Sequence, residues 1–175
     1  MRMILPLCMD IAPGRHENRT MIAIRAAQRG ADLDVVRELF REYAASTRAP
    51  ACFTMLEDEL AALPGAYAPP DGRLLLAEDG GPAGCVALRR LDAGTAEMKR
   101  LYVRDRMRGS GLGRRLAQAV IDAARATGAH RLVLDTLPHM ASAQALYRNL
   151  GFREIAPYLA EPTPGAICFE LKLGP

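Results

Sequence analysis

The chain has few of the residues that build metal centres and disulfide frameworks. Its 175 residues include four cysteines and three histidines. The cysteines lie far apart with no C-x-x-C spacing, and the histidines form no ligand pattern with them, so neither a metal site nor a disulfide framework is predicted. Cys85 and Cys168 lie within apolar, strand-like runs and are predicted to be small core residues, whereas Cys8 and Cys52 have no assigned role. Reduced cysteines of this kind are expected in the cytoplasm.

A strong excess of one charge is also missing. The chain has 23 basic and 20 acidic residues, which gives a formal net charge of +3. This is too small to predict a general nucleic-acid or membrane surface, so neither is expected as a partner. The apolar run at Met1–Ala12 is interrupted by Pro6 and Asp10, and no small-residue cleavage site follows. A signal peptide is therefore not predicted, and the run is too short to span a bilayer.

Repeats and linkers are absent as well, which favours a single domain. Half of the residues are hydrophobic, and a chain of about 150 residues can bury roughly 68 to 70% of its unfolded surface. Met21 opens a clean strand pattern. We therefore expect residues 1–20 to be a disordered N-terminal extension or the product of an upstream start codon, and residues 21–175 to form one domain.

Hydrophobic periodicity predicts strands that alternate with helices. Apolar residues at helical spacing predict four helices, the first of them with Asp32 as its N-cap, over residues 32–46, 56–63, 112–128 and 141–150. Strand patterns cover residues 21–25, 74–78, 83–89, 97–103, 131–135 and 166–173. The order of one strand, two helices, three strands, helix, strand, helix and strand predicts a mixed α/β sheet with helices on both faces.

The most informative segment joins the strand that ends at Val103 to the next helix. Gly109, Gly111 and Gly113 stand where this helix begins. A helix start has unpaired N–H groups and the positive end of the macrodipole, and glycines let an anion approach that backbone. The segment therefore predicts a site for a phosphorylated cofactor. Six arginines, opposed only by Asp105, are expected to attract a polyanion there unless they merely form a solvated helix face: Arg100, Arg104, Arg106, Arg108, Arg114 and Arg115.

A dinucleotide-binding fold is the main competing interpretation of these glycines. Gly109-x-Gly111 precedes a helix, and Asp135 ends the next strand about 20 residues later, as that fingerprint requires. However, Arg114 stands where the fingerprint needs Gly or Ala, residues 104–108 separate the strand from the glycines, and no second βαβ half follows. A P-loop is excluded because no Gly-Lys-Ser or Gly-Lys-Thr follows the glycines.

The downstream chain makes the pattern specific. Arg-x-x-Gly-x-Gly at 108–113, the strand at 131–135 and Ala-x-x-Leu-Tyr-x-x-Leu-Gly-Phe at 143–152 closely resemble the GNAT superfamily of acetyl-CoA-dependent N-acyltransferases. The resemblance covers most of the chain from Met21 onward. It implies a mixed, mostly antiparallel sheet of about six to seven strands with helices on both faces, splayed into a V near the middle. It also implies an enzyme that moves an acetyl group from acetyl-CoA to a primary amine by direct attack.

The resemblance assigns cofactor contacts to two backbone segments. The amides of the glycine loop are expected to hold the pyrophosphate, namely those of Arg108, Gly109, Ser110, Gly111, Leu112 and Gly113. The backbone of Leu101, Tyr102 and Val103 is expected to pair with the pantetheine arm, strand to strand. The family often carries an asparagine seven residues before its tyrosine, but Met140 stands there, so Ser142 or backbone groups would supply that contact.

Two side chains match the family's acid and base. An alkylammonium of pKa about 10.4 must lose a proton before it attacks, and Glu97 matches the frequent general base, acting directly or through water. Tyr147 matches the acid that protonates the departing thiolate. The structural alternatives are an ion pair of Glu97 with Lys99 or Arg100, and a core role for Tyr147. Other carboxylates remain candidate bases: Glu57, Asp58, Glu59 and Glu154.

No readable motif identifies the acceptor. Residues 48–71 and 157–165, which carry Phe53, Tyr67 and Tyr158, are expected to set specificity because they are rich in loops. A small amine or amino acid, a peptide N-terminus, a protein lysine and an aminoglycoside all remain open, as does a homodimer. A non-catalytic acyl-CoA-binding regulatory domain is the second functional hypothesis. Because such a domain would tolerate loss of the acid and base, the presence of both favours an enzyme.

Overall fold

The structure is a computed structural model, and it describes residues 22–27, 30–47 and 55–174. The helices are α1 (Ala31–Thr47), α2 (Leu56–Ala62), α3 (Leu112–Ala126) and α4 (Ala141–Asn149). The strands are β1 (Ala23–Ala26), β2 (Arg73–Glu78), β3 (Pro82–Arg90), β4 (Thr95–Val103), β5 (Arg131–Thr136), β6 (Arg153–Ile155) and β7 (Ile167–Lys172). The predicted extension at 1–20, together with Cys8, Cys52 and Phe53, lies outside the described residues and stays a matter of prediction.

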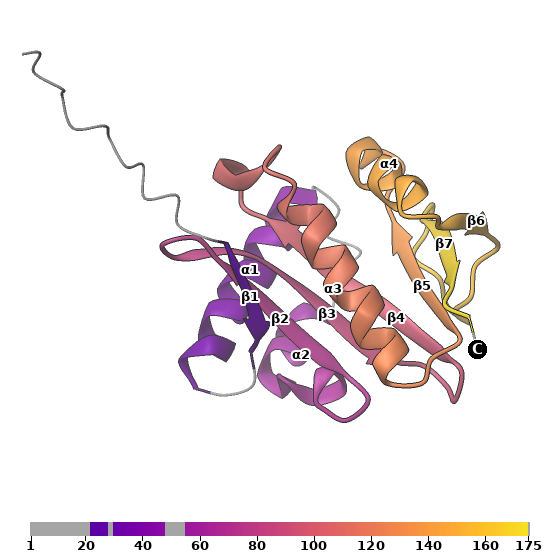
Figure 1. Ribbon diagram of the computed structural model, residues 1–175, viewed down its shortest axis with the longest axis horizontal. Helices are drawn as coiled ribbons and strands as arrows, with labels where there is room; N and C mark the ends of the chain where they lie inside the picture. The colour runs from indigo at the N-terminus through magenta and orange to yellow at the C-terminus, as the bar shows by residue number, and fades with distance from the viewer. Residues whose placement is uncertain (1–21, 28–29, 48–54, 175) are drawn as a thin grey trace, which may run out of the picture.

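The described strands form one seven-stranded sheet in the order β1-β2-β3-β4-β5-β7-β6. The β4–β5 pair is parallel and the remaining pairs are antiparallel. Figure 1 shows α3 and α4 on one face of the sheet and α1 and α2 on the other. This confirms the predicted mixed, mostly antiparallel sheet with helices on both faces. A sheet with a single parallel pair is not a doubly wound dinucleotide-binding fold, so that alternative is wrong.

Each face of the sheet carries its own apolar core. Successive side chains of a strand point to opposite faces, so Cys85 packs towards α1 and α2 while Val86 packs towards α3. Phe40 of α1 and Leu116 of α3 are fully buried in the two cores. Cys85 and Cys168 are buried, as predicted. Within the described ranges, no helix is both long enough and apolar enough to cross a bilayer.

Apart from shifts of one or two residues at the ends of elements, such as β4 from Thr95 instead of Glu97, the structure differs from the predicted elements at two points. Asp32 is not the N-cap of α1, because the helix already begins at Ala31. Its carboxylate instead accepts two hydrogen bonds of 2.7 Å from Arg25 of β1, which ties the first turn of the helix to the edge of the sheet. Strand β6 was not predicted. Its three residues, Arg153–Ile155, are too few to show an alternating pattern.

Candidate active site

The sheet opens between its two central strands. Pairing of β4 with β5 is confined to residues 95–97 of β4 and 131–133 of β5, although β4 continues to Val103. Along its other edge, β4 stays paired with β3 as far as Val103. Beyond the paired residues the two strands diverge, with α3 over one and α4 over the other (Figure 1). The edge of β4 that faces this opening therefore offers main-chain N–H and C=O groups to a ligand.

A β-bulge in β4 marks the start of the opening. Arg100 and Leu101 of β4 together lie opposite a single residue of β3, Val86. Arg100 has φ 57°, which is rare for a residue with a side chain and costs on the order of 1 kcal/mol. Its guanidinium donates to Glu59 of α2, with 3.1 Å between Nε and Oε1, and lies 6.0 Å from the centre of the Phe40 ring. These contacts hold the bulge in place and direct Arg100 towards α1 and α2.

The glycine loop reaches the same opening from the side of α3. A Cβ built on Gly113 would lie 3.7 Å from Leu146 of α4 and 3.8 Å from Val103 of β4. The first turn of α3 thus sits between the two sides of the cleft. Gly109 and Gly111 have φ values of 78° and 83°, and a Cβ on either would have no atom within 4 Å. The described residues therefore leave the space over Gly109 and Gly111 unfilled. The amides of Arg108 and Ser110 donate to carbonyls of the same segment at 3.1 and 3.4 Å, and the expected contacts of the loop with a pyrophosphate stay a prediction.

The arginines around this loop do not form an unopposed ring of positive charge. Arg104 donates to Glu38 at 2.7 Å and to Glu42 at 2.6 and 3.0 Å, and both carboxylates belong to α1. The Arg104 guanidinium lowers the pKa of Glu42. Arg108 lies 2.8 Å from Asp105 in an exposed pair, which is weak and can be exchanged for a ligand. The expectation that Asp105 alone opposes these arginines is wrong.

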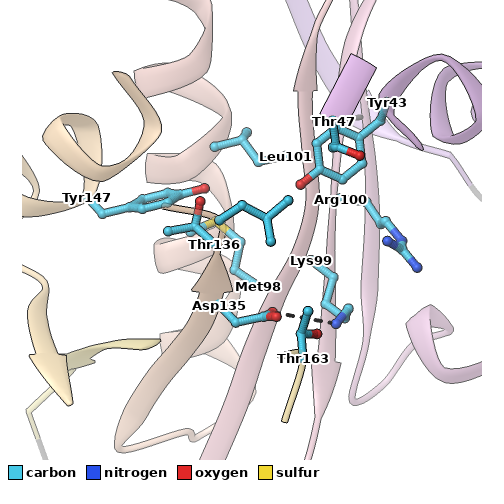
Figure 2. A pocket seen from close by; sticks show the side chains of 11 residues that line it. Tyr43, Thr47, Met98, Lys99, Arg100, Leu101, Asp135, Thr136, Tyr147 and Thr163 are labelled. Carbon is cyan, nitrogen blue, oxygen red and sulfur yellow. Dashed lines mark ion pairs between the residues drawn. The ribbon is translucent and has the colours of Figure 1, made fainter. Parts of the chain in front are cut away.

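Tyr147 of α4 reaches into the cleft. Figure 2 shows its hydroxyl pointing towards Thr136 and Leu101, across from Lys99. Lys99 Nζ lies 3.8 Å from Asp135 Oδ1. Burial raises the pKa of Tyr147, so its phenol is protonated at neutral pH. The cavity is lined by residues of α1, β4, β5 with the residue that follows it, α4 and the segment before β7: Tyr43, Thr47, Met98, Lys99, Arg100, Leu101, Asp135, Thr136, Leu137, Tyr147 and Thr163.

Glu97 lies on the face of the sheet that carries α1 and α2, and its side chain is fully buried. Its Oε2 accepts a hydrogen bond of 2.5 Å from Arg89 Nε on β3, and its Oε1 accepts one of 2.7 Å from the Tyr158 hydroxyl. Lys99 Nζ lies 3.5 Å from the same Oε1. The predicted contact with Lys99 is therefore present, but the partner on the neighbouring strand is Arg89.

Lys99 connects this carboxylate with two cavities. It lines the cleft and also a cavity on the α2 side, whose walls come from α2, the following turn, β3 and β4: Met55, Asp58, Glu59, Ala62, Leu63, Pro64, Gly65, Ala66, Tyr67, Arg89, Lys99 and Arg100. Tyr67, predicted to contribute to specificity, donates a 2.6 Å hydrogen bond to Glu59. The α2-side cavity therefore shares Lys99 with the cleft, and it shares Arg89 with the surroundings of Glu97.

Three of the other four candidate bases are engaged in ion pairs. Glu57 is exposed and pairs with Arg41 at 2.8 Å. Glu154 is exposed on β6 and lies 3.5 Å from Arg148. Glu59 is held by Arg100 and Tyr67, as described above. Asp58 lines the α2-side cavity and remains a candidate by position alone.

Sequence patterns missed two residues of the site, Tyr43 and Thr47, which line the cleft from α1. Thr163 lines it from the segment before β7 and belongs to residues 157–165, which were expected to set specificity. No motif links these segments, because they meet only after the sheet has formed. Tyr158 was expected in the specificity region but lies against Glu97. Ser142 is exposed in the first turn of α4, and its predicted contact with a cofactor stays a prediction.

Comparison with known proteins agrees with this geometry. Residues 33–152 match the model of the acetyltransferase (GNAT) family. The chain is 37% identical over 155 residues to a protein of Schizosaccharomyces pombe named as an uncharacterized N-acetyltransferase, covering 87% of this chain and 95% of that one. A Streptococcus agalactiae acetyltransferase has a TM-score of 0.73 at 22% identity, covering 86% and 98% of the two chains. A Thermoplasma acidophilum N-acetyltransferase in complex with coenzyme A has a TM-score of 0.70 at 19% identity, covering 86% and 98%. The chain belongs to the GNAT family of N-acetyltransferases, as its sequence predicted.

Proposed function

We propose that the protein transfers an acetyl group from acetyl-CoA to a primary amine by direct attack. One observation carries this proposal: three features that acetyl transfer needs face the same opening in the sheet. They are the unpaired edge of β4, the first turn of α3 and the hydroxyl of Tyr147. The complex of the structurally similar Thermoplasma acidophilum protein with coenzyme A supports the choice of cosubstrate, and the name of the Schizosaccharomyces pombe relative supports an amine as acceptor.

The residues of the cleft fit acetyl-CoA. The first turn of a helix has N–H groups without intrahelical partners, which suits a pyrophosphate, and the space over Gly109 and Gly111 leaves room for it. The backbone of residues 101–103 would pair with the pantetheine arm. Ser142 would contribute a hydroxyl from α4. Bound acetyl-CoA would supply an acyl group that is activated as a thioester.

Two side chains of the site would act as the base and as the hydrogen-bond donor of the reaction. Glu97 would receive the proton of the acceptor ammonium, which otherwise keeps it at neutral pH because its pKa is about 10.4. Tyr147 would donate a hydrogen bond at the leaving sulfur. Its raised pKa keeps that hydrogen in place, so the phenol acts first as a donor to developing negative charge. The buried cysteines agree with action in a reducing cytoplasm.

Two measurements on the purified protein test the proposal. Calorimetry should show that acetyl-CoA binds, and NADH should bind more weakly or not at all. A panel of amines should then be screened by thiol release, with amino acids, small amines, peptides with free N-termini, lysine-containing proteins and aminoglycosides. Turnover of at least one acceptor is expected. Tight binding without turnover of any acceptor would favour the non-catalytic acyl-CoA-binding domain, and absence of binding would overturn the cosubstrate assignment.

A further inference from the structure

The carboxylate of Glu97 has no exposed surface through which an amine could reach it. Its side chain is 0% exposed. Within the described residues, its partners are Arg89 at 2.5 Å, Tyr158 at 2.7 Å and Lys99 at 3.5 Å. Both carboxylate oxygens are therefore covered by donors. An acceptor amine can therefore give its proton to Glu97 only if it displaces one of these groups or if one of them passes the proton on.

The chemistry of the three donors separates them. A guanidinium and an ammonium carry donors and no acceptor, so Arg89 and Lys99 cannot take up a proton while they hold the carboxylate. A phenol oxygen donates one hydrogen and also accepts through its lone pairs. Of the three partners, Tyr158 is thus the one that can receive a proton from outside and pass its own hydrogen inwards.

The segment that carries Tyr158 borders the cleft. Tyr158 is partly exposed, in contrast to Glu97. It belongs to the segment between β6 and β7, and Thr163 of the same segment lines the cleft with Lys99 and Asp135. Burial and the neighbouring Glu97 carboxylate raise the pKa of Tyr158, and Asp135 acts in the same direction. The phenol therefore keeps its hydrogen throughout the pH range of an ordinary assay.

We propose that Tyr158 is a further catalytic residue, which relays the proton of the acceptor amine to Glu97. The inference rests on the proposed acetyl transfer to an amine. In the relay, the N–H bond of the ammonium breaks and a bond forms between that hydrogen and the Tyr158 oxygen. At the same time the original O–H bond of Tyr158 breaks and its hydrogen bonds to Glu97 Oε1. The nitrogen keeps its electron pair for attack on the acyl carbon, and Tyr158 ends neutral.

The test compares two acceptors of different basicity in the wild type and in Tyr158→Phe. One is the best alkylamine from the panel, and the other is its analogue with a trifluoromethyl group on the amine-bearing carbon, which is largely free base near neutral pH. With the alkylamine, the variant should lose roughly 100-fold in kcat/KM at pH 7. With the fluorinated amine, it should lose less than about 3-fold, because the proton is already gone. With the alkylamine, raising the pH to about 10.4 should bring the kcat/KM of Tyr158→Phe closer to that of the wild type, because more of this amine is then free base.

A second comparison separates a relay from a packing role. Glu97→Gln and the double variant Glu97→Gln/Tyr158→Phe should lose about as much rate as Tyr158→Phe alone, because all three interrupt one proton path. Equal losses with both amines would make Tyr158 a packing residue and overturn the relay. Unchanged turnover by Tyr158→Phe would show that Glu97 is reached directly, with the same consequence. If the wild type binds acetyl-CoA but acetylates no amine, the proposed function itself fails, and the relay fails with it.

Discussion

At Glu97, burial and charge oppose each other. A carboxylate removed from water loses its hydration, and charge-assisted hydrogen bonds from Arg89 and contact with Lys99 restore part of that loss. Replacement by a neutral amide keeps the volume but leaves Arg89, a third of whose side chain is exposed, with a weaker acceptor. The variant is expected to fold, so its kinetics can be interpreted.

Glu97→Gln should lower the rate of amine acetylation near neutral pH and recover part of it at high pH. A protonated amine needs a base, whereas above about pH 10.4 the free amine forms without help. The measurement is the ratio of wild-type to variant kcat/KM from pH 6 to pH 10. A merely structural Glu97 would produce the same ratio at every pH, and that result would direct attention to Asp58 or to an ordered water.

Tyr147→Phe should lower kcat roughly 10² to 10⁴-fold with little change in acetyl-CoA affinity. The raised pKa of Tyr147 leads to an expectation for the pH profile of the wild type. A phenol with a raised pKa stays a donor until the pH exceeds its ordinary value of about 10, so Tyr147 should cause no basic limb below that pH. Steady-state kinetics and calorimetry of both proteins provide the measurement. Equal turnover would leave Tyr147 as a packing residue among Phe152 and Phe169.

The family resemblance predicted Glu97 and Tyr147 as candidates but could not predict their surroundings. Both residues match positions that the family uses for its base and its acid. Tyr158 lies 61 residues from Glu97 along the chain, and their contact depends on how the segment before β7 crosses the sheet. Tertiary contacts of this kind have no counterpart in periodicity or in a motif.

At the scale of elements, prediction succeeded where patterns are long and failed where they are short or interrupted. The apolar stripe of α3 predicted its first residue and its buried face, although the helix ends at Ala126, before the predicted end at Gly128. The β-bulge at Arg100 was not predicted, because bulges with a bulky residue in the left-handed region leave no compositional sign. The ion pairs of Arg104 were missed as well, since their carboxylates lie more than 60 positions earlier in the chain.

The start of α3 offers a test of the cofactor assignment with a matched control. Gly111→Val should weaken acetyl-CoA binding at least about tenfold, because its side chain would fill the space over the amides and strain a backbone with φ 83°. Gly128 follows the other end of the same helix with φ 75° and equally open space. Gly128→Val should therefore cost comparable stability and leave the affinity near the wild-type value. Calorimetry and thermal melts of both variants decide the matter, and wild-type binding by folded Gly111→Val would remove the assignment.

The hydrogen bonds from Arg104 to Glu38 and Glu42 of α1 predict a pH-dependent contribution to stability. Arg104→Ala should lower the free energy of unfolding by about 1 kcal/mol at pH 7, which corresponds to roughly 2 to 4 °C in Tm. Because Arg104 lowers the pKa of Glu42, the stabilisation is present above the ordinary carboxyl pKa and is lost as the pH falls through the lowered value. The difference between wild type and variant should thus shrink below about pH 4. Arg114→Ala, an exposed change on α3, should stay within about 0.5 kcal/mol.

At the scale of the whole molecule, the sheet consists of two parts joined by a short seam. Strands β1 to β4 form one part and β5 to β7 the other, and the seam is the pairing of residues 95–97 with 131–133. The family resemblance implied this splay, whereas hydrophobic periodicity alone could not show it, because a strand pattern does not reveal where a neighbour departs. A ligand in the cleft would contact both parts, which links binding to the stability of the entire fold.

This arrangement predicts where acetyl-CoA will protect the backbone from hydrogen exchange. Amides of β4 that face the cleft lack a strand partner there, so peptides covering residues 98–103 should exchange faster than those of β3, whose neighbours pair on both edges. Saturating acetyl-CoA should slow exchange in these β4 peptides and in the first turn of α3.

Binding at 100 times Kd adds about 2.7 kcal/mol to global stability, so β3 peptides that exchange by global opening report this common increment. Protection of residues 98–103 beyond that increment would show that the arm lies along the strand. Protection of the α3 turn alone would confine the ligand to the glycine loop and leave the edge of β4 without a role in binding.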